Sequence, residues 1–163
     1  MGTPLYVLLV EDLEDDALLL VRRLRQGGYD PTWERVDTAA TMEAALEERR
    51  WDLVISDHSM PAFSSSAALE LLRRKGFDDL PFIIVSGQIG EDAAVAAMKA
   101  GAHDYLMKDD LGRLTSAIER ELREAGVRRE RRRAEDALRV SETRFRLMIE
   151  QSPLSIQIFS PDG

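Results

Sequence analysis

Short apolar runs alternate with segments of helical spacing along the first 120 residues of the chain. Brief runs rich in Val, Ile and Leu are typical of buried strands, whereas apolar residues three or four positions apart indicate helices. The predicted strands cover residues 5–10, 32–36, 53–56, 82–85 and 103–107. A helix is expected after each strand, over residues 17–24, 41–50, 68–72, about 91–100 and from 114 onward.

Five strands that alternate with five helices predict an α/β fold with a doubly wound, mostly parallel sheet. Its right-handed crossovers place helices on both faces of the sheet. Ligands of such sheets bind at the carboxyl ends of the strands, near the point where the strand order reverses. We therefore expect the functional residues to follow the ends of the predicted strands.

The composition indicates a protein that buries a core and does not cross a membrane. The 163 residues are 44% hydrophobic, with a mean hydropathy of -0.27, and no apolar run approaches the roughly 18 residues that a membrane span needs. The start of the chain lacks a basic stretch and reaches an acid at Glu11, so it does not resemble a signal peptide and we expect a cytoplasmic protein. Cysteine is absent, which excludes disulfides and thiolate metal sites.

The net charge of -8 is unevenly distributed. Residues 1–115 carry 12 basic and 21 acidic side chains, a net charge of -9, whereas residues 116–163 carry 10 and 9, a net charge of +1. This difference argues for two segments. The acidic segment repels nucleic acid and suits a divalent cation or a basic partner.

Charged and polar residues follow four of the predicted strands. They are Glu11 and Asp12, then Asp57, Ser86 and Lys108. An aspartate can attack a phosphoryl group to form an acyl phosphate. Because that attack brings two anions together, it needs a hard cation such as Mg²⁺, which prefers one or two carboxylates plus other oxygen ligands. An ammonium and a hydroxyl group at the same edge would neutralise and bind the phosphoryl oxygens.

Residues 5–120 resemble a response-regulator receiver domain, the phosphorylatable part of a two-component system. The resemblance rests on Glu11-Asp12, Asp57 with Met60-Pro61, Ser86-Gly87, and Tyr105 with Lys108. It implies a flavodoxin-like receiver fold with a five-stranded parallel sheet in the order 2-1-3-4-5. It also implies transfer of a phosphoryl group from a histidine kinase or phosphotransfer protein to Asp57. The chain departs from the family's frequent residues at Ser65, often Gly, and at Asp109, often Pro.

The resemblance also implies a role for each matched residue. Mg²⁺ would be held by Asp12, Asp57 and the backbone carbonyl of Ser59, with Glu11 as an outer acid. Lys108 and Ser86 would bind the phosphoryl oxygens.

The resemblance also implies that Ser86 and Tyr105 form a switch pair. When Asp57 is phosphorylated, Ser86 would move toward the phosphoryl group and Tyr105 would turn inward. Other polar residues near the site have simpler interpretations. Asp15 and Asp16 are expected to favour the positive end of the first helix. His58 is expected at the surface, because neighbouring residues of a strand point to opposite faces.

The last third of the chain predicts a long helix. Residues 114–150 contain no proline and only Gly126 as a helix breaker, which allows about 37 residues and roughly 55 Å of helix. Its heptad-like apolar positions change phase at Gly126, and they predict a homodimer through this helix. The arginines of residues 128–133 are interspersed with acids, so we expect a solvated face that binds no nucleic acid.

Residues 141–163 resemble the beginning of a PAS sensory domain, too short to close its own core. We therefore expect a receiver domain over residues 1–120, a signalling helix or coiled coil over residues 114–150 that continues the last receiver helix, and an incomplete PAS domain over residues 141–163. In this organisation the phosphoryl signal passes through the dimeric helix to a downstream output region. The chain has no ATP-binding Gly-rich loop and no evident kinase domain, so the only expected chemistry is its own phosphoryl transfer and slow self-dephosphorylation.

Three alternatives remain open. A Mg²⁺-dependent phosphohydrolase with an aspartyl nucleophile would carry a second Asp two residues after the first-strand Asp, but Asp12 is followed by Leu13 and Glu14. A flavodoxin-like carrier is disfavoured because acids after the first strand repel a flavin phosphate. A phosphorylation-independent dimerisation or docking module with the same fold is not distinguished by the sequence.

Overall fold

The computed structural model describes residues 1–88 and 90–151, and the chain divides into two compact units between Gly126 and Val127. The first unit contains one parallel sheet of five strands. The strands are β1 (Thr3–Val10), β2 (Tyr29–Val36), β3 (Leu53–Asp57), β4 (Phe82–Ser86) and β5 (Asp104–Met107). The helices are α1 (Glu14–Gln26), α2 (Ala39–Glu48), α3 (Ser65–Arg74), α4 (Glu91–Ala100), the short 3-10 helix η1 (Leu111–Arg113) and α5 (Leu114–Gln151).

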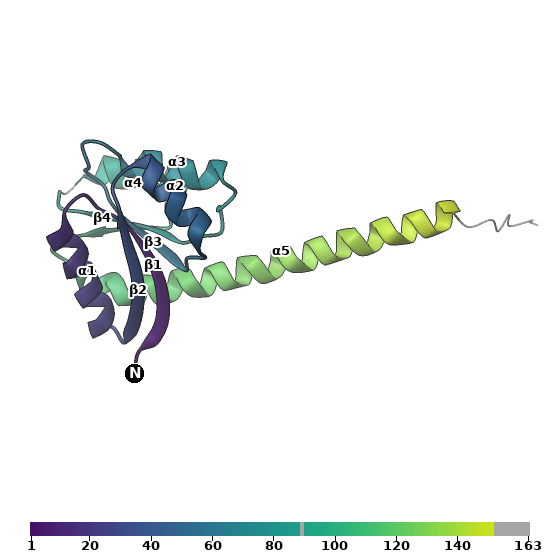
Figure 1. Ribbon diagram of the computed structural model, residues 1–163, viewed down its shortest axis with the longest axis horizontal. Helices are drawn as coiled ribbons and strands as arrows, with labels where there is room; N and C mark the ends of the chain where they lie inside the picture. Colours follow the sequence, from purple (N-terminus) through teal and green to yellow (C-terminus); the bar gives the residue numbers. More distant parts are fainter. Residues whose placement is uncertain (89, 152–163) are drawn as a thin grey trace, which may run out of the picture. The chain divides into compact units, whose positions relative to one another are not determined.

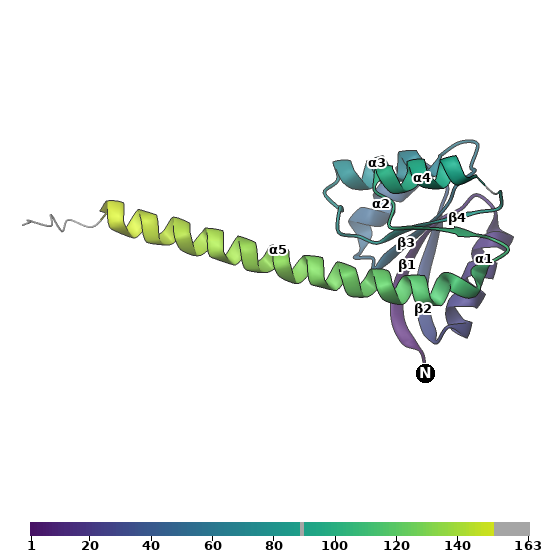
Figure 2. The ribbon, with the colours of Figure 1, turned by 180° about the vertical axis from the view of Figure 1, so that it is seen from behind.

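The strand order is β2-β1-β3-β4-β5, and every neighbouring pair is parallel. Helix α1 and the start of α5 cover one face of the sheet, and α2, α3 and α4 cover the other (Figures 1 and 2). The predicted doubly wound sheet in the order 2-1-3-4-5, with a long C-terminal helix, is therefore confirmed.

Two apolar layers fix the helices to the sheet. Alternate residues of the central strand β1 point to opposite faces, so Leu8 and Val10 belong to the layer under α2, α3 and α4, while Val7 and Leu9 belong to the layer under α1 and α5. Strands β3 and β4 are buried along their whole lengths, as expected for central strands of a parallel sheet covered on both faces.

The second strand begins three residues earlier than predicted, at Tyr29 rather than Thr32. Pro31 within it has no amide hydrogen for a ladder bond, which conflicts with a central strand at this point. The structure resolves the conflict because β2 is the edge strand of the sheet. An edge strand needs hydrogen-bond partners on one side only, and proline is tolerated there.

Helix α5 belongs partly to each compact unit, since it extends from Leu114 to Gln151. Within the first unit, one face of α5 is buried, and this face carries Leu114, Ala117, Ile118 and Ala125. None of the helices described over residues 1–88 and 90–151 has the length and hydropathy that crossing a membrane requires. Residues 152–163, where the predicted PAS strand and turn fall, lie outside the described part of the chain.

Candidate functional site

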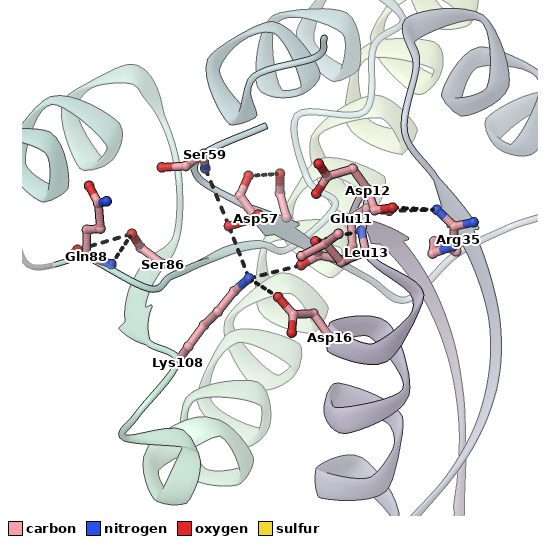
Figure 3. A network of polar contacts seen from close by, with 11 residues as sticks. Glu11, Asp12, Leu13, Asp16, Arg35, Asp57, Ser59, Ser86, Gln88 and Lys108 are labelled. Atoms are coloured by element: carbon pink, nitrogen blue, oxygen red, sulfur yellow. Dashed lines mark hydrogen bonds and ion pairs between the residues drawn. The ribbon is translucent and has the colours of Figure 1, made fainter. Parts of the chain in front are cut away.

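The strand register brings the four predicted polar positions to one edge of the sheet. Val10 pairs with Ser56, Asp57 with Val85, and Ser86 with Met107. Asp57 and Ser86 end their strands, Glu11 and Lys108 directly follow theirs, and Asp12 comes one residue after Glu11. Figure 3 shows Glu11, Asp12, Asp57 and Lys108 close together at this edge, with Ser86 turned toward Gln88.

Three carboxylates meet there. Ligand oxygens of Glu11, Asp12 and Asp57 all lie within 4.8 Å of one another. Glu11 is 1% exposed and Asp57 is 6% exposed, while Asp12 is the most accessible of the three. Three carboxylates this close repel one another, so the arrangement favours a cation.

Burial controls the ionisation of Glu11. Removal of its carboxylate from water raises its pKa from 4.5 to about 7, and the negative charge of Asp57 adds to the rise. The Leu13 amide, which donates a 3.1 Å hydrogen bond to Glu11 Oε1, and the charge of Lys108 act in the opposite direction. Glu11 therefore takes up a proton near neutral pH unless a cation compensates its charge.

Lys108 places an ammonium group among the acids. Its Nζ lies 3.3 Å from Glu11 Oε2 and 3.5 Å from Asp57 Oδ1. Burial lowers the pKa of Lys108, but its hydrogen bond to Asp16 and the charges of Glu11, Asp57 and Asp16 outweigh that effect, so the pKa is raised overall. Lys108 is thus held in its charged form beside Asp57.

Asp16 is a site residue that the sequence did not reveal. It was expected to serve only the helix terminus, but its Oδ2 lies 2.6 Å from Lys108 Nζ. In the sequence, an acid that only interacts with the helix dipole cannot be distinguished from an acid that also pairs with a distant residue, because both lie in the first turn of a helix. The one available clue was its position in the first helical turn after the strand that carries Glu11 and Asp12.

A second unpredicted residue, Arg35, fixes the loop that carries the first two acids. Its Nη1 donates hydrogen bonds to the backbone carbonyls of Glu11, at 3.1 Å, and Asp12, at 3.3 Å (Figure 3). Arg35 comes from β2, which pairs with β1 beside this loop. A single arginine near a strand end carries no distinctive sequence signal, because most arginines are solvated.

Two serines have different relations to Asp57. The backbone amide of Ser59 donates a 3.4 Å hydrogen bond to Asp57 Oδ1, so the Ser59 backbone lies beside the carboxylate. The Ser86 hydroxyl donates to the backbone carbonyl of Gln88 at 3.1 Å and accepts from its amide at 3.3 Å. Ser86 is thus at the same sheet edge, but its hydroxyl is engaged with its own loop.

His58 is half-buried, so the expectation of a surface residue holds only in part. Its ring contacts that of Tyr105 edge to face, with ring centroids 5.7 Å apart, and its Nδ1 lies 3.2 Å from the hydroxyl oxygen of buried Ser65. These contacts with β5 and α3 cover part of the side chain. The Tyr105 hydroxyl is itself buried, with no hydrogen-bond partner in the described part of the chain.

The fold and this site define a class of protein, and comparison with known families agrees. A family model described as the response regulator receiver domain matches residues 7–119. The chain belongs to the response regulator receiver family, and residues 7–119 are the receiver domain of a two-component response regulator.

Curated relatives include the transcriptional regulatory protein PrrA of Mycobacterium tuberculosis. It is 33% identical over 121 residues, which cover 74% of this chain and 51% of PrrA. The response regulator protein FleR of Pseudomonas aeruginosa is 38% identical over 104 residues, which cover 63% of this chain and 21% of FleR. The chain thus spans about half the length of PrrA and less of FleR.

Solved structures of the same fold include the signal receiver domain of a signal transduction histidine kinase from Syntrophus aciditrophicus. It has a TM-score of 0.61 at 28% identity and covers 72% of this chain and 89% of that one. The response regulator StyR has a TM-score of 0.67 at 30% identity and covers 85% of this chain and 68% of its own.

Proposed function

We propose that the chain is a phosphoacceptor that takes a phosphoryl group onto Asp57 from the phosphohistidine of a histidine kinase or phosphotransfer protein. The observation that carries the proposal is the position of Asp57. It is a nearly buried carboxylate 3.5 Å from the Lys108 ammonium group and within 4.8 Å of two further acids. Receiver domains of response regulators interact with such donors.

The transfer makes and breaks one bond. An Asp57 carboxylate oxygen attacks the phosphorus atom, a P–O bond forms, and the P–N bond to the donor imidazole breaks with its electron pair remaining on nitrogen. Lys108 offsets the negative charge of the phosphoryl oxygens next to Asp57. Slow attack of water on phosphorus later restores the carboxylate, and this self-dephosphorylation needs no further domain.

The acids of the site fit a Mg²⁺ ion. Its direct ligands would be Asp12, Asp57 and the backbone carbonyl of Ser59. Glu11 would be an outer acid that adds negative charge to the site without binding the ion directly. Hard oxygen donors on two or three short, closely spaced groups match the preference of Mg²⁺. When bound, the cation offsets the repulsion between Asp57 and the incoming phosphoryl group.

Ser86 and Tyr105 would report the phosphorylated state. To donate to a phosphoryl oxygen, the Ser86 hydroxyl must leave its hydrogen bonds with Gln88. Tyr105 lies in the next strand, packed against the apolar layer that includes Ile84 and Ala97. We propose that a movement of the loop after Ser86 would change the packing of Tyr105 against this layer.

The signal would leave the receiver through α5. We infer a receiver over residues 1–120 and a dimeric signalling helix over residues 114–150. We also infer the start of a PAS domain over residues 141–163, with an output region further on. In the second unit, one series of helix positions is spaced alternately by four and three residues: Val127, Arg131, Ala134, Leu138, Ser141, Phe145 and Met148. The four large apolar side chains of this series, Val127, Leu138, Phe145 and Met148, are all exposed. A second copy of the helix would cover them.

Two alternatives receive less support. A phosphohydrolase that uses Asp12 as nucleophile would need the ammonium at Asp12, whereas the ion pairs of Lys108 are with Glu11, Asp16 and Asp57. A docking module that works without phosphorylation would not require Asp57 and Lys108 to be adjacent. Failure of the labelling experiment below would favour the docking module.

The direct test is intact mass after incubation with Mg²⁺ and acetyl phosphate. We expect the parent to gain one increment of about 80 Da and Asp57→Asn to gain none. Asp92→Asn, an exposed acid in the first turn of α4, is the matched control and should label like the parent. Equal labelling of Asp57→Asn and the parent would refute the assignment of the acceptor.

A further inference from the structure

Lys108 has three carboxylate neighbours, and the nearest of them is not the proposed phosphoacceptor. Its Nζ lies 2.6 Å from Asp16 Oδ2, 3.3 Å from Glu11 Oε2 and 3.5 Å from Asp57 Oδ1 (Figure 3). Charge-assisted N–H···O bonds are ordinarily about 2.7–2.9 Å long. The contact with Asp16 is slightly shorter than this range and is a charge-assisted hydrogen bond, while the longer contact with Asp57 is an ion pair without that bond.

The start of α1 explains why Asp16 is available. Asp16 is the third residue of the helix, a position whose carboxylate commonly accepts a hydrogen bond from the amide of the residue before the helix. Here that residue is Leu13, and its amide donates to Glu11 Oε1 instead. With this donor occupied, the Asp16 carboxylate turns to Lys108, the residue that follows β5.

We propose that Asp16 is a positioning residue that restrains Lys108 and so slows phosphorylation of Asp57. This inference rests on the phosphoacceptor role proposed above. The ammonium group must come closer to Asp57 to bind phosphoryl oxygens there, and each step toward them stretches its bond to Asp16. Asp16 also neutralises part of the ammonium charge that would otherwise act on the incoming anion.

The burial of the pair gives the restraint its strength. The Lys108 side chain is 23% exposed and that of Asp16 is 32% exposed, so water and salt screen their attraction less than that of a fully exposed pair. Asp16 takes no part in the cluster of Glu11, Asp12 and Asp57 that fits a cation. Its removal should therefore leave Mg²⁺ binding largely intact and act on Lys108.

The test is the rate at which Mg²⁺ and acetyl phosphate label the intact chain, followed by mass, in the parent, Asp16→Asn and Asp15→Asn. Asp15 lies in the same helical turn and is exposed, so its variant removes the same charge without touching Lys108. We expect Asp16→Asn to label about fivefold faster than the parent, the factor of an ordinary partly buried ion pair, and Asp15→Asn to remain within about twofold. Equal rates in the two variants would overturn the inference.

The same comparison in a Lys108→Ala background separates restraint from simple charge repulsion. If Asp16 acts through Lys108, the added Asp16→Asn substitution should change the labelling rate by less than about twofold in that background. An undiminished acceleration there would show that Asp16 only repels the incoming anion, and would refute its positioning role.

A second readout needs no phosphorylation. The chain has three lysines, Lys75, Lys99 and Lys108, so their side-chain ammonium signals in NMR can be assigned by substitution. Asp16→Asn should shift the Lys108 signal and leave the other two in place, and an unmoved Lys108 signal would contradict the ion pair. If the parent took up no phosphoryl group, the proposed function would fail, while this spectrum would still report whether Asp16 holds Lys108.

Discussion

The two parts of α5 share one helix and have opposite surroundings. In the first compact unit, Leu114, Ile118 and Ala125 are at most 1% exposed, and Leu114 and Ile118 pack in the apolar layer that α1 shares. In the second unit, Phe145 and Met148 are 66% and 69% exposed. Both parts carry apolar residues at helical spacing. The periodicity therefore indicates that a helix face is suited to burial, but it does not indicate what covers that face.

This contrast explains the division of tasks that we propose. The first part of the helix is a structural element of the phosphoacceptor unit, and its sequence is constrained by the packing of the sheet. The second part presents an apolar face that a second chain would cover. In this proposal, a change in the receiver would reach the second unit along α5, because one helix belongs to both units.

Truncation of one buried and one exposed side chain tests the contrast most strongly. Ile118→Ala removes a fully buried side chain and should lower the free energy of unfolding by about 3 kcal/mol. Leu138→Ala, at 61% exposure, should lower it by less than about 0.5 kcal/mol. Trp33 and Trp51, the two tryptophans of the chain, lie in the first unit, so urea unfolding followed by their fluorescence reports that unit. Comparable losses in the two variants would remove the distinction.

Oligomeric state tests what covers the exposed face. We expect the full chain to be a dimer by light scattering across a dilution series, and a chain ending at Gly126 to be a monomer with Ile118 and Ala125 still buried. Phe145→Glu places a charge in the proposed seam and should dissociate the dimer. Thr143→Glu, two residues away on another face of the helix, is the matched control and should remain dimeric. A monomeric full chain would contradict dimerisation through the helix.

The pH dependence of Mg²⁺ binding tests whether the first unit works without the second, because all proposed ligands lie in the first unit. The pKa of Glu11 is about 7 instead of 4.5, so the metal-free protein has extra stability that is present below about pH 4.5 and lost as the pH rises through about 7. Protons and Mg²⁺ then compete, and affinity should fall about tenfold from pH 8 to pH 6.

Calorimetric titration of the full chain and of residues 1–126 should give the same pH profile. Glu11→Gln should flatten it, since the group that titrates is gone. Asp12→Ala should instead weaken Mg²⁺ binding at every pH, because it removes a proposed direct ligand. A profile that persists in Glu11→Gln would assign the proton to another group.

Much of the fold was predictable because its signals are local. Strands β3 and β4 appear in the sequence as short continuous apolar runs, and the acids and lysine that follow strands reach one edge by the topology of a parallel sheet. The first residues of β2 were missed because the tolerance of Pro31 depends on which strand lies at the edge.

The site residues that the sequence did not reveal were missed for the same reason, because their roles depend on tertiary contacts. Asp16 and Arg35 act through partners more than 20 residues away along the chain. The partial burial of His58 was not predicted because its contacts with Tyr105 and Ser65 are tertiary. Local sequence thus predicted which groups gather at the site, but not the polar contacts that hold them there.

The central claim is that Asp57 accepts a phosphoryl group with the help of Mg²⁺ and Lys108. Fluorine NMR of the chain with Mg²⁺ and fluoroberyllate, a phosphoryl mimic, tests it most directly, because a bound mimic gives signals distinct from those in solution. We predict bound signals for the parent and for Asp92→Asn, and none for Asp57→Asn or in the absence of Mg²⁺. Bound signals that persist in Asp57→Asn, or their absence from the parent, would contradict the account.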